Sequence, residues 1–392
     1  MPTVEVVVAG HVSLDVFPAL HGPVTLEPGR LIEIGPAAFS TGGAVTNTGL
    51  ALHRLGVPVR LVGRLGADLF GRAVLDMLER RERGLSGGMV VGEGEVTSYT
   101  IVINPPGVDR SFLHCPGANQ SFTADDVPYD QLPGVRLFHF GYPPLMPRIY
   151  AGGGAQLASM FERVHAAGPG TSLDMCVPDP HSDAGRLDWE RVLARALPHV
   201  DVFAPSVDEL LFMLDRASHD RLAQASALGS VVDRAHLQRL SATLFDMGAT
   251  IVAIKLGAQG LYLRTTTARD RVARFCDRVG LRAEQWRGRE ILAPCFRPRR
   301  IMGTTGSGDT TIAGLLAAIL RGEPPAEAAT AATAVGACSV EEMDPTSGVP
   351  SWREVAARIA SGWERLPAEI GLDADEPLQA DPVGTLAATT TG

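Results

Sequence analysis

The strongest chemical signal in the chain is a glycine- and threonine-rich turn, GTTGSGD (303–309), that runs into an apolar segment with helical periodicity. Small residues before a helix let backbone N–H groups converge, and these amides bind an anion together with the helix dipole. Gly306, Ser307 and Gly308 are the candidate amides. Asp309 stands at the helix entrance, where a carboxylate is either an N-cap or a base beside a phosphate cradle. Taken alone, the turn favours the N-cap, and it is no Walker loop because no Lys follows the glycines.

Four other segments combine small residues with polar side chains. Asp15 follows the first predicted strand, where its carboxylate could accept hydrogen bonds from ligand hydroxyls. In TGGAVTNTG, Gly42 and Gly43 permit a close ligand approach, and Asn47 lies on the first turns of a helix. Asn119 ends the PGAN segment that closes a hairpin, and IKLGAQG forms a glycine turn after a buried strand. Each segment alone is also typical of an ordinary turn or cap.

The elements that must position these residues alternate between strand and helix. Strands are predicted in VEVVVA, VRLFHFG, TSLDMCV, VDVFAPS and ATIVAIKLG, and helical stretches precede the last three. This alternation predicts an α/β fold with a doubly wound, mainly parallel sheet and helices on both faces. Hairpin-like strands near 15–40, including RLIEIG (30–35), and near 96–115 predict a small β-sheet projecting from the body. Ligands bind at the carboxyl ends of the strands in such a sheet, so the polar loops there form the candidate site.

The composition describes an ordinary globular protein. The 392 residues are 45% hydrophobic and 20% charged, and the formal net charge of −9 argues against a nucleic-acid partner. The five cysteines are an odd number without a CxxC pair, which is typical of reduced thiols in the cytoplasm. The N-terminus lacks a signal sequence and no apolar run reaches the length of a membrane span, so we expect a cytoplasmic protein without a membrane partner.

Two stretches are predicted to be less ordered than the rest. Residues 264–290 are rich in Arg and Thr and resemble an insertion, and residues 371–392 lack aromatic residues and periodicity. We therefore expect one domain over residues 1–370, followed by a flexible tail at 371–392.

Taken together, the motifs resemble those of the ribokinase-like (PfkB) family of carbohydrate and nucleoside kinases. GTTGSGD is similar to the family signature DTxGAGD, and it follows the glycine pair with Asn47, the GRLGADLFG block, PGAN and KLGAQG in the family's order. The resemblance covers nearly the whole chain, from about residue 4 to about residue 360. One such motif is weak evidence, whereas five in the right order are strong evidence.

The resemblance implies a role for each matching residue. Asp309 matches the base that takes the proton of the acceptor hydroxyl, and the Gly306–Gly308 amides match the anion hole that stabilises the transferring phosphoryl group. The segments at 15–40 and 96–115 match a lid that closes over the substrate and excludes water. The positions that match substrate contacts are Asp15, Gly42, Gly43, Asn47 and Asn119.

The resemblance also implies a nucleotide and a metal. Gly257 and Gly260 match the turn that borders ATP, and the resemblance places the Ala334–Ala337 region near the adenine. Lys255 is a candidate phosphate contact, with a salt-bridged structural lysine as the alternative. Ser206 and Glu209 match the element linked to Mg²⁺, with Ser206 acting through a water.

Three departures from the family pattern affect these expectations. Gly303 stands where the signature has an Asp linked to monovalent cations, so a dependence on K⁺ is in doubt. Ala44 replaces a Lys of the ribokinase branch, which weakens the case for ribose. Ser206 replaces an Asn, a milder change because a hydroxyl can also hold a metal-bound water.

The resulting prediction is an ATP-dependent transfer of a phosphoryl group to a hydroxyl, preferably a primary one, of a sugar or sugar-like molecule. A nucleoside kinase on the same fold and a non-catalytic sensor of sugars or nucleotides are the alternatives. Family members often pair through their lids, so the resemblance is also consistent with a homodimer formed through the lid.

Overall fold

The computed structural model describes residues 3–22, 27–105, 111–225, 228–368, 370, 379–380 and 386–389. Its centre is a ten-stranded sheet in the order β15-β16-β14-β13-β12-β11-β10-β9-β1-β4. Six neighbouring strands run parallel: β4 (Val59–Val62), β1 (Val6–Gly10), β9 (Leu137–Gly141), β10 (Gly170–Asp174), β11 (Val202–Phe203) and β12 (Ile251–Lys255). Beyond β12 the sheet continues antiparallel with β13 (Leu261–Thr265), β14 (Arg289–Ala293), β16 (Leu386–Thr389) and β15 (Gln379–Ala380). The predicted doubly wound, mainly parallel sheet is confirmed.

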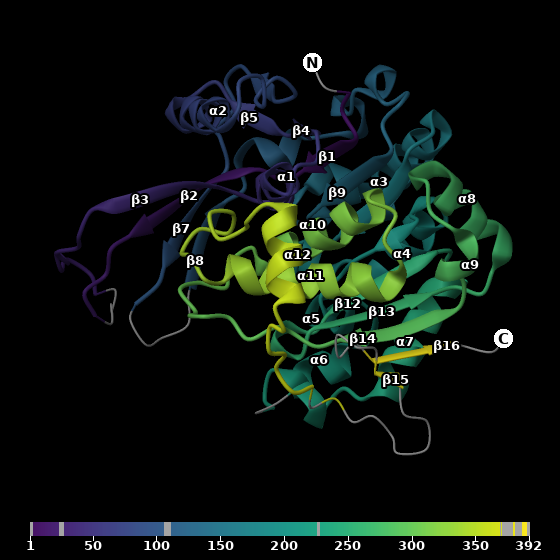
Figure 1. Ribbon diagram of the computed structural model, residues 1–392. Helices are drawn as coiled ribbons and strands as arrows, with labels where there is room; N and C mark the ends of the chain where they lie inside the picture. The colour runs from purple at the N-terminus through teal and green to yellow at the C-terminus, as the bar shows by residue number, and fades with distance from the viewer. Residues whose placement is uncertain are drawn as a thin grey trace.

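Helices cover both faces of this sheet (Figure 1). Successive side chains of a strand point to opposite faces, so Val6 and Val8 of β1 enter one core cluster while Val7 and Ala9 enter the other. The first core is covered by α1 (Ala44–Arg54), α2 (Leu69–Arg81), α8 (Arg269–Val279), α10 (Ser307–Leu320), α11 (Pro325–Ser339) and α12 (Trp352–Ala360). The second core is covered by α3 (Pro147–Ala167), α4 (Trp189–Ala196), α5 (Val207–Leu214) and α7 (Arg234–Asp246), and α6 (Arg216–Leu222) packs beside α5.

A second sheet of four strands projects from this body and is called the lid below (Figure 1). Its order is β3-β2-β7-β8, with β3 (Ala37–Gly42), β2 (Ser13–Pro18), β7 (Tyr99–Ile103) and β8 (Ser111–Cys115). Strands β2 and β3 are antiparallel, as are β7 and β8, which confirms the two predicted hairpin-like regions. The strand predicted at RLIEIG (30–35) is wrong, because no strand forms there and β3 begins only at Ala37. Residues 23–26 and 106–110 of the predicted lid segments lie outside the described residues.

Helix α2 packs at the base of the lid, next to a short parallel pair of strands, β5 (Arg64–Gly66) and β6 (Val90–Gly92). The helix begins after Asp68, whose Oδ1 accepts the Gly71 N–H at 2.8 Å. A side-chain oxygen at this position satisfies one of the amides that a helix N-terminus leaves without a partner.

The expectation of reduced order at residues 264–290 is wrong. Helix α8 and the short α9 (Ala283–Trp286) fill the connection between β13 and β14, and the rings of Phe275 and Trp286 are fully buried. The buried apolar residues of α8 recur at helical spacing, but the many arginines between them make this periodicity hard to recognise in the sequence. Within the predicted tail, β16 pairs with β14 and β15 pairs with β16, so part of the tail extends the central sheet. The rest of the tail lies outside the described residues.

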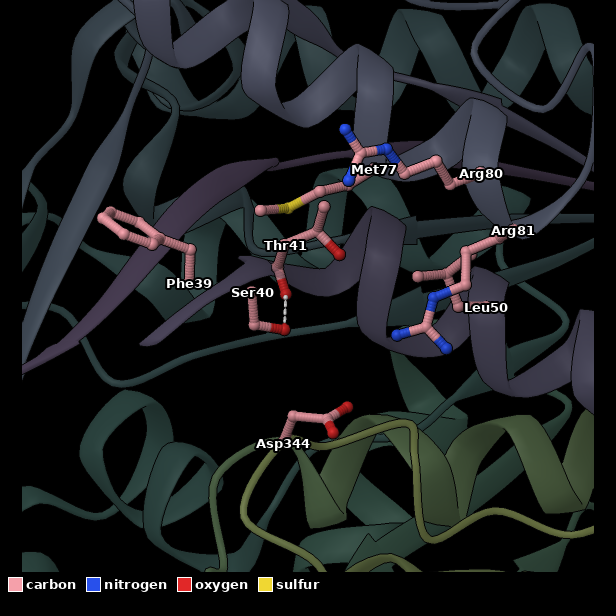
Figure 2. Close-up of a pocket in the computed structure, with 8 residues that line it drawn as sticks. All are labelled: Phe39, Ser40, Thr41, Leu50, Met77, Arg80, Arg81 and Asp344. Carbon is pink, nitrogen blue, oxygen red and sulfur yellow. Dashed lines mark hydrogen bonds between the residues drawn. The ribbon is translucent and has the colours of Figure 1, made fainter. Parts of the chain in front are cut away.

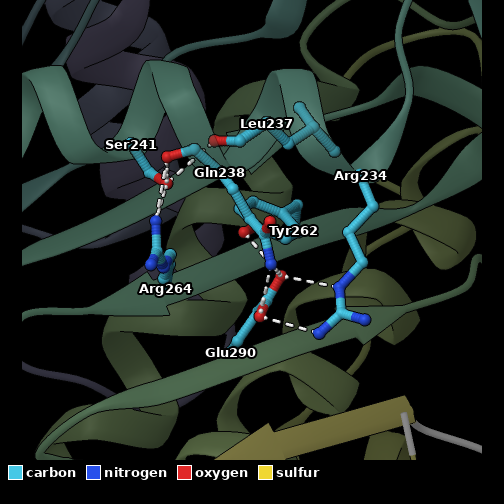
Figure 3. Close-up of polar contacts among 7 residues, drawn as sticks. All are labelled: Arg234, Leu237, Gln238, Ser241, Tyr262, Arg264 and Glu290. Atoms are coloured by element: carbon cyan, nitrogen blue, oxygen red, sulfur yellow. Dashed lines mark hydrogen bonds and ion pairs between the residues drawn. The ribbon is translucent and has the colours of Figure 1, made fainter. Parts of the chain in front are cut away.

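A buried carboxylate on β14 links α7 to the antiparallel strands of the sheet (Figure 3). Glu290 on β14 accepts hydrogen bonds from Arg234 and Gln238 of α7 and from the Tyr262 hydroxyl of β13, at 2.9 to 3.1 Å. Although burial opposes ionisation, these donors lower the pKa of Glu290. The Glu290 carboxylate is therefore a structural charge whose hydrogen bonds are all made within the fold.

Among the described helices, none is long and apolar enough to cross a membrane.

Candidate active site

Asp309 lies in the first turn of α10 and is almost completely buried. Its Oδ2 accepts the Asn47 Nδ2–H at 3.0 Å, and the Tyr142 hydroxyl lies 2.8 Å from both carboxylate oxygens. Burial raises the pKa of Asp309, while the Asn47 hydrogen bond, the positive charge of Lys255 and the Tyr142 hydrogen bond act in the opposite direction. No cap hydrogen bond from a side chain is formed at this helix start. The side chain therefore points into a polar site rather than capping α10.

The turn before α10 presents main-chain amides beside Asp309. Gly306 has φ 71°, in the left-handed region, and a Cβ on it would lie 2.3 Å from the Pro345 side chain, so only glycine fits. Ser307 N–H donates to the Thr304 carbonyl at 3.3 Å, whereas Gly306 and Gly308 N–H have no hydrogen-bond partner within the described chain. Both amides stand at the positive end of a 14-residue helix. The turn thus has the geometry of an anion-binding cradle.

Tyr142 is a site residue that the sequence did not reveal. It follows the last residue of β9 and has φ 69° and ψ 49°, the only left-handed conformation of a non-glycine residue in the described parts of the chain. Burial and the neighbouring Asp309 carboxylate raise the pKa of Tyr142, so its hydroxyl stays protonated and donates. Its position at the carboxyl end of a central strand was the available signal, but GYPPL is also an ordinary turn sequence.

Asp15 extends from β2 of the lid toward the same site and is 6% exposed. Ser13 Oγ donates to its Oδ1 at 3.0 Å. Burial raises the pKa of Asp15 to about 6, with a further contribution from the Asp309 charge. A Cβ on Gly42 would lie 2.2 Å from Asp15 Oδ2, so the first glycine of the pair makes room for this carboxylate. The absence of a side chain at Gly42 thus leaves space for the Asp15 carboxylate, whereas the prediction was a close approach of a ligand to this glycine.

His11 is the second site residue that sequence reasoning missed. It follows β1 and is 3% exposed, yet neither ring nitrogen has a hydrogen-bond partner. Its ring centroid lies 5.4 Å from that of His114 in the lid and 6.0 Å from that of Tyr142. Burial and the neighbouring His114 lower the pKa of His11 to about 3, so the ring is neutral. A Cβ on Gly43, which has φ 87°, would lie 2.5 Å from His11 Nδ1, so the second glycine makes room for this ring.

Asn119 does not present its amide to the site. The side chain is fully buried, its Oδ1 accepts the Val12 N–H at 3.2 Å, and its Nδ2 donates to the Val12 carbonyl at 2.9 Å. Both polar groups are occupied in this way, which differs from the predicted substrate contact. Asn119 instead holds the loop between β1 and β2, and thereby the backbone between His11 and Asp15.

Lys255 ends β12 and approaches the anion cradle from the side of the central sheet. Its Nζ forms a buried ion pair with Asp174 Oδ1 at 2.6 Å and lies 3.6 Å from the position of a Cβ on Gly308. Burial opposes the lysine charge, but Asp174 and Glu209 outweigh it and raise the pKa of Lys255. Asp174 keeps a second oxygen, Oδ2, buried without a partner. The two alternatives for Lys255, a phosphate contact and a salt-bridged structural lysine, are therefore compatible, because the paired lysine also borders the cradle.

A cavity of about 460 Å³ borders the cradle at Ser307 and Gly308. Gly257 and Gly260 border it as predicted, together with Lys255, Ser307 and Gly308. Within the predicted Ala334–Ala337 region, Gly336 and Ala337 line the cavity together with the neighbouring Thr333, whereas Ala334 is fully buried in the helix core. Helical periodicity places Ala334 on the face of α11 that packs inward.

Ser206 and Glu209 form a reciprocal cap at the start of α5. Glu209 Oε2 accepts the Ser206 N–H at 2.6 Å, and Ser206 Oγ accepts the Glu209 N–H at 3.2 Å. Burial raises the pKa of Glu209, and this carboxylate contributes to the raised pKa of Asp174. No cluster of three metal-ligating side chains is present in the described ranges. A magnesium ion bound to nucleotide phosphates needs only one or two protein carboxylates, and the partnerless Asp174 Oδ2 beside Glu209 fits this requirement.

A smaller cavity of about 230 Å³ lies between the base of the lid and the C-terminal part of the chain (Figure 2). Arg80 and Arg81 of α2 and Asp344 lie on opposite sides of it. Asp344 precedes Pro345, the residue that packs against Gly306. The Glu342 and Met343 carbonyls of the same loop lie 3.5 and 3.1 Å from the position of a Cβ on Gly303. This loop thus connects the lid base with the anion cradle.

The site thus combines a lid, a buried carboxylate, an anion cradle and an adjoining cavity. This arrangement is typical of a small-molecule kinase. The pfkB family carbohydrate kinase pattern matches residues 4–352, so the chain belongs to this family of sugar kinases.

Related sequences and solved structures agree with this assignment. An uncharacterized sugar kinase of Archaeoglobus fulgidus is 23% identical over 302 residues, which cover 77% of this chain and 98% of the relative. A nucleoside kinase of Methanothermobacter thermautotrophicus is 22% identical and covers 92% of this chain and 96% of its own. The structure of Arabidopsis thaliana ribokinase complexed with ribose and ATP matches with a TM-score of 0.67 and 18% identity, over 91% of this chain and 98% of the other. The last comparison confirms the predicted ribokinase-like fold.

Proposed function

We propose that this kinase transfers the terminal phosphoryl group of ATP to a hydroxyl, preferably a primary one, of a sugar or sugar-like molecule, with Asp309 as the general base. The observation that carries the proposal is the position of the Asp309 carboxylate between the amides of the 306–308 turn and the polar side chains of the lid side. A general base must lie close to both the acceptor hydroxyl and the transferring phosphoryl group. The Asp309 carboxylate borders both the lid-side polar residues and the 306–308 amides.

The acceptor hydroxyl would bind between Asn47 and Asp309. Asn47 donates to Asp309 through Nδ2, and its buried Oδ1 has no partner. Oδ1 of Asp309 accepts only from Tyr142 and keeps a lone pair for the acceptor proton. In the reaction the acceptor oxygen attacks the phosphorus atom in line with the departing oxygen, and Asp309 takes the proton.

The cradle and Lys255 act on the transferring group. Gly306 and Gly308 N–H and the dipole of α10 stabilise charge on the equatorial phosphoryl oxygens, because these fixed dipoles need no reorganisation during the reaction. Lys255 stands beside Gly308 and adds a positive charge within the same cradle. The cavity bordered by Gly257, Gly260 and Ala337 would hold the rest of the nucleotide.

Asp174 and Glu209 would hold a magnesium ion through its waters, with Ser206 supporting Glu209. When bound, the ion would neutralise phosphate charge. The cap between Ser206 and Glu209 fixes the orientation of this carboxylate before any metal arrives. Gly303 supplies no side-chain oxygen for a monovalent cation, so ADP assays with and without K⁺ are needed to decide whether turnover depends on this ion.

The lid side would recognise the remaining hydroxyls of the acceptor. Asp15 offers a carboxylate that accepts from Ser13 and can accept further hydrogen bonds. Neutral His11 offers one donor and one acceptor nitrogen, and neither nitrogen has a protein partner. Unpaired buried polar groups favour a ligand that completes their hydrogen bonds, as a polyol does. The lid also exposes Phe39, Phe112 and Leu113, which supports a homodimer formed through this sheet.

The test is the substitution Asp309→Asn in a coupled assay of ADP formation with a panel of sugars and nucleosides. The variant should fold with an unchanged thermal midpoint and lose at least about 10²-fold in kcat, because proton acceptance is removed without a change of shape. Near-wild-type turnover by this variant would exclude Asp309 as the base. Nucleosides that stabilise the protein more than sugars would favour the nucleoside kinase, and stabilisation by ligands without ADP formation would favour the sensor.

A further inference from the structure

Tyr142 has a conformation that its own sequence does not favour. A side chain with a Cβ rarely adopts φ 69° and ψ 49°, and the residue is neither glycine nor asparagine. Strained backbone of this kind persists where the surroundings fix it, and it occurs often at functional sites. Here the left-handed turn directs the chain from the end of β9 into Pro143–Leu145, while the phenol reaches Asp309.

The contact between the phenol and the carboxylate is symmetrical. The Tyr142 oxygen lies 2.8 Å from Oδ1 and 2.8 Å from Oδ2 of Asp309, so one hydroxyl proton is shared between both oxygens. Asn47 adds a third contact, to Oδ2 only. Rotation of the carboxylate about its last torsion would lengthen one of these contacts, so the three together fix its plane.

On the proposed function of Asp309, we propose that Tyr142 is a positioning residue for the base: its hydroxyl fixes the plane of the carboxylate and leaves Oδ1 as the oxygen that receives the acceptor proton. Oδ2 accepts from both Asn47 and Tyr142, whereas Oδ1 accepts from Tyr142 alone. The acceptor hydroxyl therefore adds to the existing contacts without displacing them. Tyr142 does not transfer a proton, since its hydroxyl remains a donor throughout.

A second consequence concerns the protonation state of the base. Burial favours the neutral acid form of Asp309, and each donor to the carboxylate favours the charged form. Because only the charged form can accept a proton, turnover is present above the pKa of Asp309 and is lost as the pH falls through it. Removal of the Tyr142 hydroxyl raises this pKa and moves the acid limb of the kcat profile to higher pH.

The experiment compares Tyr142→Phe with the wild-type enzyme in pH profiles of kcat from pH 5 to 9. A shift of the acid limb to higher pH by about one unit is expected, which lowers kcat about tenfold below the limb. Loss of the fixed carboxylate plane adds a smaller fall in kcat that is equal at every pH, and the KM for ATP should stay the same. A ring that only packs would leave the acid limb in place, and an unshifted limb would overturn the proposal.

Tyr129→Phe is the matched control. Its half-buried hydroxyl donates one hydrogen bond, to the Ala124 carbonyl at 2.7 Å, and it has no contact with Asp309. This variant loses the same phenol oxygen and should leave the acid limb in place. Tyr142→Asn adds a side chain that tolerates the left-handed conformation, and it should fold well while the limb shifts as in the Phe variant.

A direct measurement separates this proposal from the proposed function. The carboxyl carbons of ¹³C-labelled aspartates are titrated by NMR, and the Asp309 signal is assigned by its absence from Asp309→Asn. The apparent pKa of Asp309 should be higher in Tyr142→Phe than in the wild-type protein, and an unchanged value would refute the positioning role. If no acceptor yields ADP, the proposed function fails, while this titration still decides whether Tyr142 holds the carboxylate.

Discussion

The lid side and the proposed nucleotide side of the site are lined by different kinds of residues. On the lid side, Asp15, His11 and Asn47 are all buried, and both His11 ring nitrogens and Asn47 Oδ1 lack a hydrogen-bond partner. On the proposed nucleotide side, the 460 Å³ cavity is bordered by glycines and apolar side chains such as Phe296 and Ile301, together with Lys255 and several hydroxyl side chains. On the proposed function, the first region would recognise the acceptor by buried polar side chains, and the second would recognise the nucleotide mainly by shape.

This difference indicates which substrate each region can discriminate. Buried side chains that lack partners penalise a ligand that fails to complete their hydrogen bonds, so the lid side is expected to set acceptor specificity. A cavity of backbone and apolar surface accepts a nucleotide through shape and stacking, and its contacts change little with pH. Lys255 and the 306–308 turn lie where the two regions meet, so changes there should affect both substrates.

The largest effect is expected at this junction, for Lys255→Met. Turnover should fall by at least about 10²-fold, because the cradle loses its positive charge, and the protein should lose about 3–5 kcal/mol of stability, because Asp174 is left buried without its counterion. The double variant Lys255→Met/Asp174→Asn removes both charges and should regain most of the stability without regaining turnover. Chemical denaturation and ADP assays measure the two effects separately. Recovery of turnover together with stability would show that Lys255 is purely structural.

An intermediate effect should divide the two regions cleanly. His11→Phe keeps a ring of similar size but removes both nitrogens, so the KM of the acceptor should rise about tenfold, the equivalent of one lost hydrogen bond to a buried polar group. Ala337→Leu fills part of the nucleotide cavity, so the KM of ATP should rise about tenfold at an unchanged acceptor KM. Initial-rate measurements with each substrate varied in turn test the pair. If either variant changed both constants equally, the two regions would not be independent.

The fold and the central part of the site could be predicted from the sequence for definite reasons. Alternating strands and helices determine a parallel sheet almost directly, and the turn at 303–309 combines glycine freedom with a helix start. These are local properties, which a linear pattern preserves. The turn alone favours an N-cap, so the roles of Asp309, Asn47 and Asp15 follow only from the family's motifs in their order. The structure brings all three residues together.

The residues that were missed depend on contacts across the fold. Tyr142 is 167 positions from Asp309 in the chain, and His11 reaches the site only because Gly43 has no side chain. The motif predicts a substrate contact for Asn119, but a linear pattern does not show that its amide bonds the Val12 backbone. Within the Ala334–Ala337 region, the sequence does not show which helix face lines the cavity and which packs in the core.

The smallest predicted effect is a pH dependence confined to the lid side. Burial holds the pKa of Asp15 at about 6, so its carboxylate becomes protonated as the pH falls from 7 to 5 and accepts acceptor hydroxyls less well. The KM of the acceptor should therefore rise a few-fold over this range, while the KM of ATP stays constant. Asp15→Asn should raise the acceptor KM at every pH and abolish the change with pH.

The same group has an opposite effect on stability, which makes the assignment stringent. A carboxyl whose pKa is higher in the folded than in the unfolded protein binds more protons when folded, so its contribution to the free energy of unfolding grows as the pH falls from about 7 toward 4. As the pH falls, acceptor binding should thus weaken while the stability of the unliganded wild-type protein relative to Asp15→Asn increases. Denaturation of both proteins at pH 5 and pH 7.5 measures this difference. A stability difference that changes in the other direction would show that Asp15 is ionised well below pH 6 and that another group controls acceptor binding.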